Sequence, residues 1–409
     1  MSLVLNTNIS SLQAQNNLNK SSSELSTATE DLSSGLKINS AADNAAGYAI
    51  ATRFQTQIGG LSQASENASD AINLAQTAGS ALSQITSNLQ SIRDLAVQAA
   101  NGTYQASDRA AINTSVQQYL SEVTRIANQT TFNGTNVLNG STSGLSFQIG
   151  SNVGQAIDVQ LGQGVTTSQM GQVSEISTAS ISGAFVSGGV SGQSISLAGL
   201  SIEGADGQTY SLSGASASNA QGVADAINAA GIAGVSAAVN AKGGINIYST
   251  GELAVSGATL TGAAGTAFNL TSGALAFGAS GVGAAASGLA AAGAAYTDGT
   301  TITASGSLAG GDVLTVDDAN QLISRVDAAL NTVSTFSSNL GAMQNRFQST
   351  IAMLSAQQTN LTSSQSTIQD TDFAATTAQL SQAQVLQQAG ISVLATANSD
   401  PQNILKLLQ

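Results

Sequence analysis

The chain has 409 residues with 10 Lys and Arg against 23 Asp and Glu, a formal net charge of −13, and it contains no His, Cys or Trp. These absences, together with widely scattered carboxylates, argue against thiolate, imidazole and paired-carboxylate catalysis and against metal sites, so we expect neither an enzyme nor a cofactor. The isolated basic residues predict no binding of nucleic acid or of anionic membrane surfaces, and no apolar run is long enough for a membrane span.

The N-terminal segment has a narrow apolar stripe. Leu18, Leu25 and Leu32 recur every seven residues, and most of the residues between them are Ser, Thr, Gln and Asn. Alone, such a stripe buries too little apolar surface to offset the loss of chain entropy, so we expect a helix only against a partner. The first residues lack the basic region and the long apolar core of a cleaved signal peptide.

Residues 32–54, LSSGLKINSAADNAAGYAIATRF, are small and polar, and we expect Gly35 and Gly47 to let the backbone bend. After them the apolar residues recur by three and four, which predicts one helix from about Ala45 to Ala100, roughly 85 Å long. So long a helix must bury its stripe against other helices. A further helix is predicted after Ser107, which we expect to be its N-cap.

The middle of the chain is different, because residues 140–312 hold 34 of the 43 glycines and glycine disfavours helices. TTFNGTNVLNG, residues 130–140, predicts an Asn-Gly turn between two short strands. Alternating segments further on predict small α+β modules, with a short helix capped by Ser218. We expect a modest core here, formed by Ile195, Leu197, Ile202, Val223, Ile227, Ile245 and Ile247.

The C-terminal part returns to helical spacing. Apolar residues recur by three and four from Val326 to Leu354 and continue to Ile368, which predicts a second long helix. Leu380 and Val393 belong to a second thin stripe. In NSDPQNILKLLQ we expect a capped break with Pro401 at the first position of a new helix. That helix would carry an apolar tip of Ile404, Leu405, Leu407 and Leu408.

Several motifs in this order resemble those of bacterial flagellin: MSLVLNTNISSLQAQNNLNKS, LSSGLKINSAADNAAGYAIATRF, IRDLAVQAANGTY, TTFNGTNVLNG and the ending NILKLLQ. The resemblance covers roughly residues 1–175 and 315–409. It implies a mainly α fold with an inserted β-rich part. The N- and C-terminal regions would form a coiled-coil bundle of long helices, with β-hairpins and a small central α+β insert on the outside.

The resemblance also implies a domain plan. Residues 1–44 and 366–409 would form an inner terminal coiled-coil domain. Residues 45–175 and 315–365 would form the helical bundle with its hairpins, and residues 176–314 would be a variable, surface-exposed outer insert. Two sets of residues follow. The assembly residues would be Leu18, Leu25, Leu32, Leu380, Val393, Ile404, Leu405 and Leu408. The connector between the helical layers would depend on Gly35, Asn39, Asp43 and Gly47.

The function implied is that of a structural subunit that assembles with copies of itself into the helical flagellar filament used for motility. Different apolar stripes on two sides of a subunit give contacts that do not close into a ring, which produces an open fibre. The implied partners are a flagellar export chaperone, the filament cap and hook-junction proteins. The location would be extracellular, after type III export. Two alternatives stay open: a hook–filament junction protein and a secreted surface adhesin.

A last implication concerns host innate immune receptors. LQSIRDLAVQ resembles the flagellin helix read by the animal receptor Toll-like receptor 5, and Arg93, Asp94, Leu95 and Glu122 match positions used there. Residues 30–51 resemble the peptide read by a plant receptor kinase. Ser91 stands where many receptor-activating flagellins have Arg, so we expect weaker binding to the animal receptor.

Overall fold

The computed structural model describes residues 8–178, 180–185, 194–257, 259–261, 267–269 and 306–407. The chain divides into two compact units. Unit 1 comprises Met1–Ser69, Gln148–Ala156 and Gln348–Gln409, and unit 2 comprises Asp70–Phe147 and Ile157–Phe347. Two long helices, α2 (Ala45–Ala99) and α5 (Val316–Gln369), run through both units. A mainly helical fold with an inserted β-rich part is confirmed.

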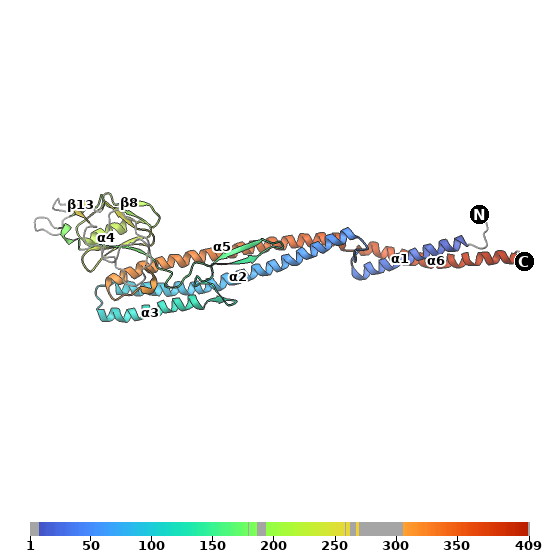
Figure 1. Cartoon of the computed structure of the whole chain (residues 1–409), viewed down its shortest axis with the longest axis horizontal. Coiled ribbons are helices and arrows are strands. Elements are labelled where there is room, and N and C mark those ends of the chain that lie inside the picture. The colour runs from blue at the N-terminus through green and yellow to red at the C-terminus, as the bar shows by residue number, and fades with distance from the viewer. Residues whose placement is uncertain are drawn as a thin grey trace. The chain divides into compact units, whose positions relative to one another are not determined.

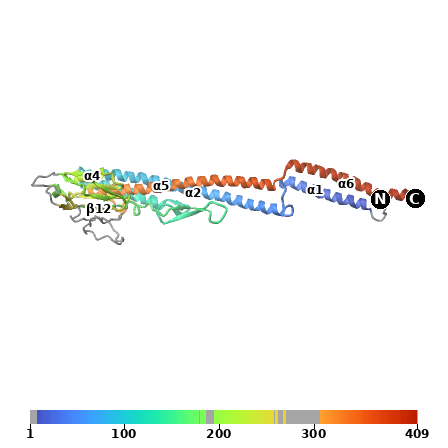
Figure 2. The ribbon, with the colours of Figure 1, turned by 90° about the horizontal axis from the view of Figure 1, so that it is seen from above.

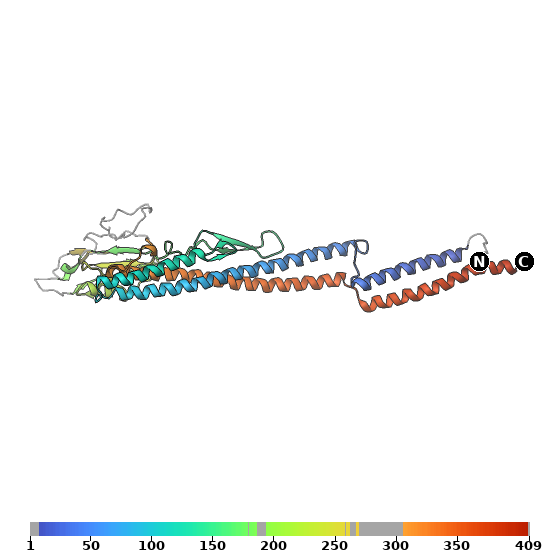
Figure 3. The same cartoon turned by 90° about the horizontal axis from the view of Figure 1, so that it is seen from below.

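In unit 1, α1 (Ile9–Ser34) and α6 (Phe373–Leu407) form an antiparallel pair. They lie side by side in two perpendicular views (Figures 1 and 3). Their backbones approach within 8 Å of each other along the pair. The side chains buried between them are small and spaced by seven residues, namely Ala14, Ser21 and Ala28 on α1 and Thr376 and Ala383 on α6. The leucine stripe predicted to form this contact is only half-buried, because the small residues let the backbones come closer than leucine would.

Unit 2 contains a helical bundle of parts of α2 and α5 together with α3 (Ala106–Gln129). The predicted stripes are buried along its length, including Leu82, Ile85 and Leu89 on α2 and Val326 and Phe336 on α5. The predicted N-cap of α3 is wrong. The helix begins one residue before Ser107, and the Asp108 carboxylate accepts the main-chain N–H of the N-cap Gln105 at 3.1 Å. A carboxylate three residues after the N-cap accepts the N–H of the N-cap residue itself, as in a capping box.

Short strands follow α3. The predicted Asn-Gly turn joins β1 (Thr131–Phe132) to β2 (Thr135–Asn136), with φ of 48° at Asn133 and 78° at Gly134. A second two-stranded sheet pairs β3 (Gly144–Gln148) with β4 (Ala156–Gln160). The next strand, β5 (Ser174–Ser177), is the third strand of an antiparallel sheet of order β10–β11–β5, in which β10 is Val235–Val239 and β11 is Ile245–Ser249.

The described part of the insert contains small sheets around one helix, α4 (Ala220–Ala229), and Figure 2 shows these elements gathered in one group. Asn219 caps α4 by accepting the N–H of Gly222 at 2.7 Å, so the predicted cap at Ser218 is wrong by one residue. Every core residue predicted for this region is buried in one cluster. Two short 3-10 helices lie in this region, η1 (Ser182–Phe185) and η2 (Leu308–Gly310). The other described strands are β6 (Ile195–Ser196), β7 (Ser201–Glu203), β8 (Thr209–Ser211), β9 (Ser216–Ala217), β12 (Ala254–Ser256), β13 (Thr259–Thr261) and β14 (Ala267–Asn269).

The helix α6 does not break at Pro401. It continues from Phe373 to Leu407, so the predicted capped break and new helix are wrong. Proline inside a helix removes the N–H that would bond to the carbonyl four residues earlier, here Ala397. In this chain the Asn8 amide donates to that carbonyl at 2.7 Å. The sequence around Pro401 alone gives no sign of this distant donor.

Candidate assembly and recognition surfaces

The α1–α6 pair places the predicted assembly residues in two different positions. Leu18, Leu25, Leu32 and Leu380 are half-buried where the helices meet. Leu18 packs close to Gly390, where an added Cβ would lie 3.3 Å from the leucine Cδ1. Val393 instead is 57% exposed. The structure gives Ile404 and Leu405 a helical backbone only, and Leu408 lies outside the described residues.

Large apolar side chains also lie on the exposed surfaces of the pair. These exposed apolar residues are Ile9, Leu12, Phe373, Val385, Leu386, Ile391 and Val393, with exposed fractions from 46% to 65%. Exposed apolar side chains gathered on a thin two-helix unit mark a surface for interaction with another protein. Of these residues the sequence predicts only Val393. The seven-residue spacing of leucines predicts the side chains where the helices meet, and the other exposed apolar residues do not follow that spacing.

The connector between α1 and α2 is held to the end of α5 by main-chain hydrogen bonds. Gly35 has a φ of 73° and ends α1, as a left-handed C-cap does. Its carbonyl accepts the N–H of Thr371 at 3.0 Å, and the N–H of Lys37 donates to the Gln369 carbonyl at 2.8 Å. The Lys37 Nζ also donates to the Thr367 carbonyl at 3.0 Å. The start of the connector is therefore tied to the end of α5 and the residues after it.

Inside the connector, Asp43 organises the turn. Its carboxylate accepts the N–H groups of Asn39 and Ser40 at 3.1 and 2.8 Å and the Ser40 hydroxyl at 3.1 Å. Hydrogen bonds from Ser40, followed by that from Asn39, hold the pKa of the Asp43 carboxyl below its ordinary value. Asn39 in turn donates its side-chain amide to the Leu36 carbonyl at 3.0 Å.

Gly47 does not make the bend expected of it. It lies in the first turn of α2, where its N–H donates to the Asn44 side chain at 2.9 Å, and its φ is not left-handed. A Cβ at this position would lie 2.6 Å from the Cδ1 of Ile38, which is buried. A side chain here would have to displace the end of Ile38, so Gly47 permits close packing, and the left-handed backbone belongs to Gly35.

In unit 2, a groove runs between α2 and α3. Its lining comes from two turns of each helix and consists of Asn88, Ser91, Asp94 and Leu95 on α2 and Ser115, Gln118, Tyr119 and Glu122 on α3. Three of the four predicted receptor-contact residues thus share one groove with Ser91. The exception is Arg93. Two ion pairs, one of Arg93 and one of Glu122, fix how these two side chains lie.

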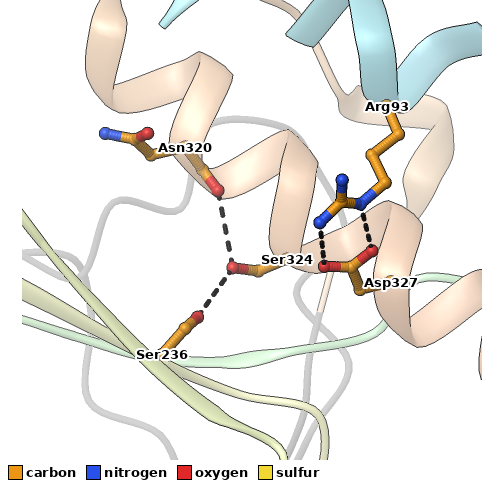
Figure 4. A network of polar contacts seen from close by, with 5 residues as sticks. All are labelled: Arg93, Ser236, Asn320, Ser324 and Asp327. Atoms are coloured by element: carbon orange, nitrogen blue, oxygen red, sulfur yellow. Dashed lines mark hydrogen bonds and ion pairs between the residues drawn. The ribbon is translucent and has the colours of Figure 1, made fainter. Parts of the chain in front are cut away.

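Arg93 points away from the groove to α5, where its Nε donates to the Asp327 carboxylate at 2.7 Å (Figure 4). This hydrogen bond and the charge of Asp327 raise the pKa of Arg93. Glu122 accepts two hydrogen bonds from the Arg125 guanidinium on its own helix, at 2.5 and 2.7 Å, which lower the pKa of Glu122. Both pairs are more than one-third exposed, so each contributes little to stability.

Comparisons with known proteins agree with this architecture. Residues 5–143 match the bacterial flagellin N-terminal helical region, and residues 323–408 match the bacterial flagellin C-terminal helical region. Three relatives align over their full lengths and the full length of this chain: B-type flagellin of Pseudomonas aeruginosa at 37% identity, flagellin of Salmonella typhimurium at 36% and flagellin A of Vibrio cholerae at 34%.

Among the described residues, no helix is long and apolar enough to cross a membrane, and no group of His, Cys, Asp and Glu side chains could hold a metal ion. The matched terminal regions contain the α1–α6 pair, the connector and the groove described above. The chain therefore belongs to the bacterial flagellin family, whose members are non-enzymatic structural subunits, exported and polymerised into the extracellular flagellar filament.

Proposed function

We propose that the α1–α6 pair is the element through which this chain polymerises, and that residues 1–44 and 366–409 form the inner domain of the filament. In this plan residues 45–175 and 315–365 form the surrounding bundle, and residues 176–314 form the outer insert. The observation that carries the proposal is the set of exposed apolar residues on α1 and α6. A second copy of the pair offers the same apolar surface and carries no dense charge to repel it.

Magnitudes indicate how assembly proceeds. Fully burying a large apolar side chain contributes about 1.5–3 kcal/mol, so the seven half-exposed side chains together contribute roughly 5–10 kcal/mol. Association itself costs about 4–15 kcal/mol in lost translational and rotational freedom. Contact with one neighbour therefore gives barely enough free energy to offset the cost of association. A subunit binds stably where it contacts several neighbours at once, as at the end of an existing filament.

The same exposed apolar residues suit partners met before assembly. A chaperone that covers the apolar surface of α6 would keep the subunit monomeric until export, because it would occupy the surface that a second subunit needs. The filament cap and the hook-junction proteins would meet the same pair at the two ends of the filament. These partners are part of the proposal and rest on the family's terminal regions together with the exposed residues of the pair.

Electron microscopy of the purified full chain, added to short filament seeds, tests the proposal. Long filaments are expected. Seeds that are capped and do not grow would favour the alternative of a hook–filament junction protein. Seeds left unchanged by a soluble monomer would favour a secreted adhesin.

A second proposed function is recognition by a host innate immune receptor at the groove between α2 and α3. The observation that favours it is the convergence of Asp94, Leu95 and Glu122 on one groove, beside Ser91. Arg93 lies outside the groove and is paired with Asp327, so its proposed contribution is indirect, through holding α2 against α5. The Glu122 carboxylate would have to exchange Arg125 for a receptor group, which its exposure allows.

A further inference from the structure

Pro401 creates a defect in α6. In a regular helix the carbonyl of Ala397 would accept the N–H of residue 401, but proline has no N–H. A main-chain carbonyl that is removed from water without a donor destabilises the helix that carries it. Because α6 continues through this position to Leu407, the half-buried Ala397 carbonyl is free to accept from a donor outside the helix backbone.

The side chain of Asn8 supplies that donor. Its Nδ2 donates to the Ala397 carbonyl at 2.7 Å. Its Oδ1 accepts the N–H of Ser11 at 3.0 Å, which makes Asn8 the N-cap of α1. One amide side chain thus satisfies an end donor of α1 and a carbonyl of α6 that has lost its helical donor. Next to it the Ser11 hydroxyl donates to the Asn398 side chain at 2.6 Å.

We propose that Asn8 is the residue that sets the register of α1 against α6, by recognising the one carbonyl that Pro401 leaves without its helical donor. Carbonyls on either side of this position keep their helical partners, so sliding α1 along α6 would abandon the Ala397 carbonyl again. This inference rests on the proposed role of the α1–α6 pair in assembly and adds the residue that aligns the pair.

The proposed role requires both ends of the Asn8 amide, which distinguishes it from a simple cap. Aspartate caps a helix as well as asparagine does, and its charge favours the helix N-terminus. It cannot donate to the Ala397 carbonyl, however, and it places a negative charge against it. Asn8→Asp therefore removes the contact between the helices and keeps the contact within α1.

The test is a double-mutant cycle in the full chain between Asn8→Asp and Pro401→Ala. Pro401→Ala restores the main-chain donor to the Ala397 carbonyl and makes the Asn8 donor dispensable. The exposed Asn16 on the same helix provides the control variant Asn16→Asp, which adds the same charge. Two measurements are made: the critical concentration for growth on filament seeds, and the yield of the disulfide between Ser11→Cys and Asn398→Cys in this otherwise Cys-free chain.

With Pro401 present, Asn8→Asp should raise the critical concentration about fivefold, the change that one net hydrogen bond gives, and lower the disulfide yield. With Pro401→Ala the effect should fall below about twofold. Equal effects in both backgrounds, or no effect with Pro401 present, would overturn the proposal. The disulfide yield does not depend on polymerisation, so it still decides the role of Asn8 if the pair proves dispensable for assembly.

Discussion

The hydroxyl of Ser21 on α1 donates to the carbonyl of Ala383 on α6 at 3.0 Å, and Ser21 is only 5% exposed. The two residues lie where the backbones of the pair come close, between the small residues Ala14 and Ala28. A helix–helix contact of this kind depends on the small size of its side chains more than on their apolar area.

Enlarging Ser21 should therefore separate the pair. Ser21→Leu is expected to destabilise it by about 1–3 kcal/mol through overpacking, whereas Ser21→Ala should lose only about 0.5–1.5 kcal/mol with its single hydrogen bond. The measurement is the temperature at which filaments depolymerise, followed by light scattering. Ser22→Leu is the matched control, because Ser22 is exposed on the same helix. Equal losses from the Leu substitutions at 21 and 22 would contradict close packing at Ser21.

The insert should be removable only at the right boundaries. The Leu308 N–H donates to the Met170 carbonyl at 2.9 Å, and the Ala309 N–H donates to the Thr167 carbonyl at 3.0 Å. These bonds join the segment that leads into the insert to the segment that leads out of it. Deleting residues 173–305 with a short Gly/Ser join keeps these bonds and should leave filament growth and bundle helicity intact. Deleting 180–312 removes the buried Leu308 and leaves β5 without its partner β11. Both deletions remove the 10 residues of α4, so circular dichroism should show helix loss beyond that share only for the second deletion. Further helix loss in both would contradict this boundary.

The long helices and the core of the insert were predictable from sequence because their signals are local and repeated. The α2 helix ends within one residue of its predicted limits, and the alternation of β10 and β11 identified them as strands. Spacing alone could not show that Ser177 pairs with Asn246, because strand pairing depends on contacts distant in the sequence. The cap positions at Gln105 and Asn219 were each missed by one or two residues, since neighbouring polar side chains compete for the same role.

The surfaces were less predictable than the elements. The leucine repeat identified α1 as a packing helix, but which side chains are buried was decided by how closely α6 approaches. Likewise, nothing in the local sequence separates Arg93 from Asp94 and Leu95. Their separation follows from the position of Asp327 on α5, far along the chain.

Glu175 should make the stability of unit 2 depend on pH. Burial raises the pKa of its carboxyl, and this outweighs the hydrogen bond from Gln321 and the charge of Arg325, which lower it. The native state therefore holds this proton more tightly than the unfolded state. Its contribution to stability is full below the ordinary carboxyl pKa and is lost as pH rises through the native-state pKa.

Glu175→Gln should accordingly raise the temperature of monomer unfolding at pH 8 by more than at pH 4.5, followed by the near-ultraviolet circular dichroism of tyrosine. Glu252→Gln is the control, because Glu252 is an exposed acid of the same unit. An equal effect of Glu175→Gln at both pH values, or a loss of stability at pH 8, would show that burial does not dominate at Glu175.

Ser91→Arg should strengthen recognition by the animal receptor. An arginine in the groove would offer charge-assisted hydrogen bonds worth about 1.5–3 kcal/mol, which serine is too short to make. The measurement is signalling by monomer in a receptor reporter assay. Ser87→Arg serves as control, because Ser87 is on the same helix outside the groove lining. No gain from Ser91→Arg, or an equal gain from Ser87→Arg, would count against the groove as the recognition site.

The central claim, that the α1–α6 pair drives polymerisation, is tested most directly by seeded growth of two truncated chains, one lacking residues 1–20 and one lacking residues 390–409. Each truncation removes exposed apolar residues of the pair and leaves the bundle of unit 2 untouched. Both chains should remain soluble monomers with a folded helical bundle and should not extend filament seeds in electron micrographs. Normal long filaments from either truncated chain would contradict the claim.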